Sequence, residues 1–271
     1  GATLQNLQLA ESIALRSYSS LDLYGSGVLG GDQLRKLTIS AGDIVNQGGG
    51  NVGFVADSIF LNNEKSAPGR LQTGPGSGSL TFHGKTITLG TGATFINRFS
   101  NVLLSATEGI TSVGVGDLTT QYRLVLRTPV LTGSAGSVRT ILANPSGSDL
   151  GGLPSLVLEQ QPGAKGTLLQ GGLGATVNLS GGIGVDISSD IILPGGALSV
   201  SAAGGNIIVS SPLDVSGGSR SFYDVTRYYD AGEVRLTADK GSVILTSNGI
   251  VNVSSTGGNA GLLAISAPAG S

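Results

Sequence analysis

The chain has 271 residues, of which 46 are glycine and only 12% are charged, and its formal net charge is −2. The absence of cysteine excludes disulfides and thiol chemistry, and the absence of a basic stripe argues against nucleic acid as a partner. No apolar run reaches the ~18 residues that a membrane helix needs, so no membrane insertion is expected. No signal peptide opens the chain, and methionine is absent even at position 1, which indicates a segment of a longer protein.

Short runs in which apolar and polar residues alternate begin near the N-terminus. Ile13 and Leu15 form one such pair and Leu21 and Leu23 another, and a period of two predicts strands. Residues 1–78 are therefore expected to form strand-rich coils or a cap. The stretch 62–79 breaks the rhythm with Gly, Pro and Ser, which predicts a long surface loop that projects between coils.

The alternation resumes at Ser79 and continues to the C-terminus. Residues 144–166 are richer in Pro, Gly and Ser, and they are expected to cross irregularly around one strand, Ser155 to Glu159. No segment of ten or more residues shows a convincing period of 3.6, so no helix is expected. Residues 79–271 are assigned to repeat coils.

A repeat is visible at the C-terminal end. The stretch Ala197 to Gly218 matches Glu233 to Gly258, and a third copy begins at Leu262. The matched positions include Leu198, Val234 and Leu263; Val200, Leu236 and Ile265; Ala202, Ala238 and Ala267; Leu213 and Val251; and Asp214 and Asn252. Each copy holds three short strands that cannot bury an apolar face alone, so the copies must stack on one another.

The strands do not predict a sandwich of hairpins. Two-residue Asn-Gly or Asp-Gly turns, the strongest hairpin signal, are nearly missing, and Asn248-Gly249 is the lone case. The unit instead repeats in one direction. The sequence therefore predicts an all-β fold, a right-handed parallel β-helix with three sides and projecting loops, whose eight to ten coils would make a rod of roughly 40–50 Å.

Several phrases, among them LDVSGG, AGEVRLTADKGSVIL, VNVSSTGGNAGLLAISAPAG and LVLRTPVLTGSAGSVRTILA, give the chain a family resemblance. It resembles filamentous-haemagglutinin-like adhesins, which bacteria export by two-partner secretion. The resemblance implies a secreted or cell-surface β-helical shaft that attaches to host receptors, matrix or biofilm polysaccharide, and an outer-membrane transporter as partner during export. The family's secretion domain carries Asn-Pro-Asn motifs, whereas only Asn144-Pro145-Ser146 comes near one here. The segment therefore resembles the exported passenger region of such a protein and not its secretion domain.

The insertion between the two full copies, residues 219–232, is the predicted ligand site. It concentrates aromatic side chains with arginine and aspartate, which suits recognition of a sugar or a protein surface. The predicted ligand-binding residues are Phe222, Tyr223, Asp224, Arg227, Tyr228, Tyr229 and Asp230. The alternative interpretation is a loop that folds back to cover one face of the shaft.

Three other sequence patterns bear on metal binding or catalysis. Gly181 to Ser188 fits a calcium-binding nonapeptide, but the preceding Gly171 to Asn178 is offset by ten and lacks the aspartate, which favours a glycine-rich turn. A carbohydrate-active β-helix enzyme, a lyase or hydrolase, is the alternative function, with Asp186, Asp190, Asp214 and Asp239 as candidate carboxylates. His83 is the only histidine, so a multi-histidine metal site is excluded, and neither a cofactor nor a metal is expected.

Overall fold

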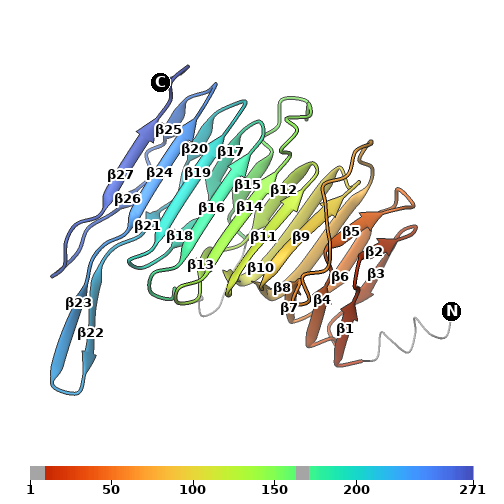
Figure 1. Cartoon of the computed structure of the whole chain (residues 1–271), viewed down its shortest axis with the longest axis horizontal. Helices are drawn as coiled ribbons and strands as arrows, with labels where there is room; N and C mark the ends of the chain where they lie inside the picture. The colour runs from red at the N-terminus through yellow and green to blue at the C-terminus, as the bar shows by residue number, and fades with distance from the viewer. Residues whose placement is uncertain (1–9, 163–170, 271) are drawn as a thin grey trace.

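The computed structural model describes residues 10–162 and 171–270, apart from the side chain of Phe222. This part of the chain is all-β, and its strands lie side by side in long parallel sheets that run from one end of the molecule to the other (Figure 1). The prediction of an all-β fold with parallel strands is confirmed. The described residues contain no helix that could cross a membrane.

The strand pairs form three ladders, and each ladder contains nine strand segments of the described chain. The first consists of β3 (Gly27–Gly30), β6 (Val52–Val55), β8 (Ser79–Leu89), β10 (Asn101–Ser112), β12 (Arg123–Arg127), β15 (Leu156–Glu159), β17 (Val185–Ser188), β20 (Ile207–Val209) and β25 (Val243–Leu245).

The second ladder shares the later halves of β8 and β10. Its other members are β1 (Ser12–Arg16), β4 (Lys36–Ser40), β7 (Ser58–Asn62), β13 (Val130–Gly133), β18 (Asp190–Ile192), β21 (Leu213–Asp214) and β26 (Val251–Asn252).

The third ladder is a sheet of its own. It consists of β2 (Ser20–Leu23), β5 (Asp43–Asn46), β9 (Gly92–Asn97), β11 (Val115–Thr120), β14 (Val138–Ala143), β16 (Thr176–Gly181), β19 (Ala197–Ala202), β24 (Glu233–Ala238) and β27 (Leu262–Ser266). Along the described chain the three ladders are visited in turn, except after β7 and after β15, so each coil stacks on the one before it.

The predicted register of the C-terminal copies is confirmed. Leu198 pairs with Val234 and Val234 with Leu263, while Leu213 pairs with Val251 and Asp214 with Asn252. Matched positions of the copies stack on one another. Because every second side chain of a strand is buried, a shift of one residue would turn the apolar side chains outward.

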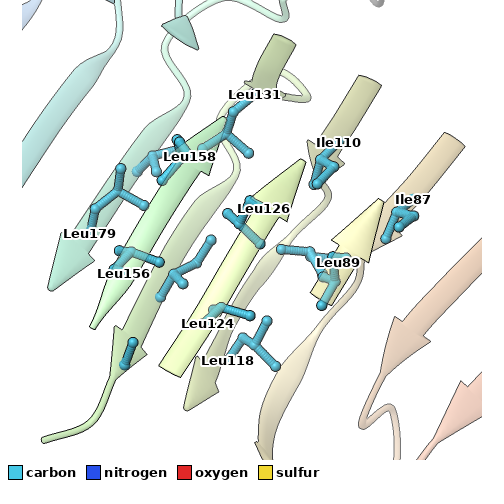
Figure 2. Close-up of a cluster of buried hydrophobic side chains, with 14 of the residues drawn as sticks. Ile87, Leu89, Ile110, Leu118, Leu124, Leu126, Leu131, Leu156, Leu158 and Leu179 are labelled. Carbon is cyan, nitrogen blue, oxygen red and sulfur yellow. The ribbon is translucent and has the colours of Figure 1, made fainter. Parts of the chain in front are cut away.

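The core is a continuous column of aliphatic side chains between the ladders. Figure 2 shows leucines and isoleucines of neighbouring coils lying one above another, among them Leu124, Leu126, Leu156 and Leu158, all fully buried. Such columns bury apolar area without any aromatic requirement. Three phenylalanines also enter the core: Phe99 is fully buried, and the rings of Phe54 and Phe82 stack near the N-terminal end with centroids 5.3 Å apart.

The stretch predicted to project as a loop instead lies along the stack. β7 ends at Asn62 and β8 begins at Ser79, and in this coil the third ladder is skipped, so β5 pairs directly with β9. We call residues 63–78 the excursion. The side chain of Asn63 holds its first turn by bonds to Ala67 and to the carbonyl of Ala93. The prediction that the stretch projects is therefore wrong, because neighbouring coils supply partners for its backbone.

Asp43, on β5, helps to hold the excursion, and its carboxyl is expected to make the stability of the fold depend on pH. Its Oδ1 accepts the backbone N–H of Arg70 and the side-chain amide of Asn97, yet burial raises the pKa of the carboxyl. The folded state thus binds this proton more tightly than the unfolded state, and the carboxyl costs stability as pH rises from about 3.8 through the raised folded pKa.

Asp43→Asn keeps an oxygen acceptor but cannot ionise. We expect its thermal midpoint to exceed that of the wild type near pH 7 and to show no such gain near pH 3.5. Thermal unfolding at both pH values, with the exposed Asp239→Asn as control, measures the difference. A difference in thermal midpoint between Asp43→Asn and the wild type that stays constant or narrows as pH rises would contradict the raised pKa of Asp43.

Candidate functional site

The predicted insertion loop is a β-hairpin. β22 (Gly218–Phe222) and β23 (Val225–Tyr229) pair antiparallel, and they extend away from the stack (Figure 1). The turn residues are Tyr223 and Asp224, and Tyr223 has a φ of 54°. The hairpin carries no Asn-Gly or Asp-Gly turn signal in the sequence, because a tyrosine occupies the left-handed position that normally favours glycine.

The hairpin distributes the predicted site residues over two faces. Residues directly opposite in an antiparallel pair point to the same side. Arg220 faces Arg227, and Gly218 faces Tyr229 on that same side. Tyr228 lies on the other side, opposite Ser219. The predicted cluster is therefore not a single surface, and Arg227 and Tyr228 point in opposite directions.

The three tyrosines differ in how they contact the stack. Tyr223 is fully exposed at the tip, and Tyr228 is 58% exposed. The ring of Tyr228 lies so close to Gly257 of the next coil that a Cβ there would meet it at 2.2 Å, and the half-buried ring of Tyr229 packs against Gly195 and Gly218. Tyr228 and Tyr229 thus brace the hairpin base, and Tyr223 alone is free of the stack.

Asp230 also anchors the base of the hairpin to the next coil. Its carboxylate accepts the backbone N–H of Asn259 at 2.7 Å and the side-chain amide of Asn259 at 3.2 Å. These hydrogen bonds hold the pKa of the carboxyl below its usual value. Asp224 is exposed at the turn, and the side chain of Phe222 lies outside the described part of the structure.

Arg220, which the sequence-based site left out, stands out on electrostatic grounds. It is directly opposite Arg227, both residues are exposed, and no ion pair joins either to a carboxylate within the described residues. Like charges placed directly opposite destabilise a strand pair. One face of the hairpin therefore presents two guanidinium groups that have no ion-pair partner among the described residues, two residue pairs below the turn that holds Tyr223.

A groove lies at the foot of the hairpin. It encloses about 480 Å³ and is lined largely by the glycine-rich turns that precede β16, β19, β24 and β27, together with Glu233. At this corner Gly232 packs on Gly196, and a Cβ on Gly232 would meet the Gly196 carbonyl at 1.6 Å. Only glycine fits such a contact, and the groove exists because no side chains project there. In the sequence, the signal for this groove is the glycine that precedes each repeated strand at the same position of each copy.

The other candidates are dispersed over the stack. Asp190 accepts a hydrogen bond from Ser211, and Asp214 accepts one from Asn252 at its stacked position in the next copy. His83 lies 3.1 Å from the hydroxyl of Ser105. Asp186, within the predicted calcium pattern, lines a separate groove. No cluster of three His, Asp or Glu residues suited to a metal occurs in the described ranges.

Comparison with protein-family models, with curated protein sequences and with solved structures gives no match.

Proposed function

We propose that the chain is part of the shaft of a large secreted or cell-surface bacterial adhesin, and that the shaft is a right-handed, three-sided β-helix. The sequence resemblance to filamentous-haemagglutinin-like proteins supports this proposal, and so do the three ladders of nine parallel segments each. In such a shaft the coils act as a rigid spacer. Export through an outer-membrane transporter belongs to the same proposal.

The single observation that carries the binding role is the Arg220–Arg227 pair. The hairpin leaves the stack and its tip adds nothing to the core, yet it holds two like charges opposite each other at a cost in stability. An anionic ligand between the guanidinium groups would relieve this repulsion, because arginine matches carboxylate and sulfate groups with paired N–H donors. Tyr223 adds an exposed ring on which a sugar can stack.

The proposed ligand is therefore an acidic glycan of host surface, matrix or biofilm. The test is a glycan array probed with the chain and with a variant in which residues 219–228 are replaced by two glycines. We expect the wild type to bind acidic glycans and the variant to bind them much more weakly while keeping its circular dichroism spectrum. Equal binding by both proteins, or no binding of acidic glycans by the wild type, would contradict the proposal.

One observation favours the second function, a carbohydrate-active enzyme. Asp186, on β17, lines a groove of about 290 Å³ together with Asn206, Pro154 and Ile208. Burial raises the pKa of its carboxyl, and the attraction of Arg123 offsets part of this shift. A carboxyl with a raised pKa in a groove is the property that a general acid requires.

The two functions predict different outcomes with soluble polysaccharides. The adhesin proposal predicts that the chain releases neither reducing ends nor unsaturated products. The enzyme function predicts turnover that Asp186→Asn lowers by at least about a hundredfold, the usual range for a general acid. Asp239→Asn, an exposed carboxylate outside the groove, is the matched control. Turnover that depends on Asp186 would replace the adhesin proposal.

A further inference from the structure

A second polar concavity lies far from the hairpin, beside the excursion. It encloses about 500 Å³ and is lined by Arg70, Leu71, Gln72, Thr73 and Arg98. Arg70 to Thr73 belong to the excursion, whereas Arg98 directly follows β9. Two arginines from segments 28 positions apart therefore line one cleft, and no carboxylate of the described chain lines it.

Arg98 is held in place on three sides. Its backbone N–H donates to the side chain of Gln121 at 2.8 Å, its carbonyl accepts from Ser77 at 3.0 Å, and its Nη1 donates to Gln47 at 3.1 Å. Its φ of 62° is a left-handed conformation that costs a non-glycine residue energy. Such a conformation persists only where the surroundings determine it, and it concentrates at binding sites.

Arg70 is positioned by a buried polar network. Asn97, fully buried at the end of β9, donates to the carbonyl of Arg70 at 3.0 Å and accepts the backbone N–H of Gln72 at 2.9 Å. Asp43, 8% exposed, accepts the backbone N–H of Arg70. These bonds fix the excursion's backbone, while Arg70 itself is exposed and lines the cleft. Asp43 attracts Arg70, but its oxygen is already engaged by backbone and amide donors.

We propose that the cleft between Arg70 and Arg98 is an oxyanion site that binds the carboxylate or sulfate group of an acidic polysaccharide. Two guanidinium groups supply planar paired donors for the oxyanion, and the hydroxyl of Thr73 supplies a further polar group for the sugar. The fixed backbone lowers the entropy that a ligand must remove on binding. The site stands on its own residues and does not depend on the hairpin.

The experiment separates this site from the hairpin. The full chain carrying Arg220→Gln and Arg227→Gln is titrated at about 20 mM salt, where screening is weak, with galacturonate oligomers and with sulfated galactan oligomers. We expect at least one of the two to bind and to shift the amide NMR signals of Leu71, Gln72 and Thr73. Adding Arg98→Gln, or Arg70→Gln, is expected to weaken that binding about tenfold. The oligomer that binds more tightly identifies the preferred oxyanion.

The matched control is Lys65→Gln, which removes one exposed positive charge from the same excursion without touching the cleft. It is expected to change affinity by less than about twofold. Arg70→Gln alters an exposed side chain, so it keeps the test valid if Arg98→Gln unfolds the chain. Amide signals that do not move, or an equal loss with Lys65→Gln, would overturn the proposal.

Discussion

Replacing Arg220 and Arg227 together by glutamine is expected to lower the affinity of the hairpin for an acidic polysaccharide about a hundredfold. Each guanidinium lost removes a charge-assisted hydrogen bond, for which a tenfold effect is typical. The same change removes the repulsion between two opposed charges, so the thermal midpoint should stay constant or rise slightly. Calorimetric titration and thermal unfolding measure the two effects separately.

The control must remove the same charge elsewhere. Lys65→Gln with Lys240→Gln also takes two exposed positive charges away, so both double variants change the net charge from −2 to −4. We expect less than a threefold loss for the lysine pair. Equal losses in both double variants would assign binding to overall charge and not to the hairpin.

A lysine variant tests the geometry. Arg220→Lys with Arg227→Lys keeps both charges but replaces the planar fork of donors by point charges. Its affinity should lie between those of the wild type and the glutamine variant. Wild-type affinity in the lysine variant would mean that charge alone is recognised.

Phe82→Ala is expected to cause the largest loss of stability, about 3–5 kcal/mol. The ring is fully buried on β8 and stacks on Phe54 of the preceding coil, so its removal leaves a cavity between two coils. In a stack of repeats each unit contacts only its neighbours, which concentrates the damage at the N-terminal half. Chemical denaturation followed by circular dichroism gives the change in unfolding free energy.

Tyr24→Ala serves as the comparison, because Tyr24 is aromatic, 76% exposed and close in the stack. It should cost less than about 0.5 kcal/mol. Glycan binding at the hairpin should survive Phe82→Ala as long as the C-terminal coils remain folded. A loss below 1 kcal/mol for Phe82→Ala would show that the coils collapse onto the cavity.

The parallel strands and the stacking of the C-terminal copies could be predicted from the sequence. Leu198, Val234 and Leu263 align there and stack in the structure, because an interior shared by every coil requires apolar side chains at the same positions. The insertions obey no such requirement. Residues 219–232 break the repeat visibly, but the pairing of Arg220 with Arg227 depends on a turn at Tyr223 that the residue types did not indicate.

Arg139 is a residue within a strand whose burial could not be predicted from the sequence. It occupies an inward position of β14, only 2% exposed, while Val138 beside it is 37% exposed, the reverse of what polarity predicts. Its guanidinium donates to the carbonyls of Leu89 and Gly90, and desolvation lowers the pKa of Arg139 to about 10. Those carbonyls belong to another coil, and their position is fixed only when the coils have stacked.

The sequence by itself determined which apolar residues of the repeated copies point inward, because burial follows the local period of two. The tertiary structure alone decided that the excursion skips a ladder and that Arg98 and Arg70 line the same cleft. It also decided that glycine turns of successive coils open a groove beside the hairpin. Each of these arises where side chains and backbone of different coils satisfy one another's hydrogen bonds, and the order of residues along the chain does not encode which coils will meet.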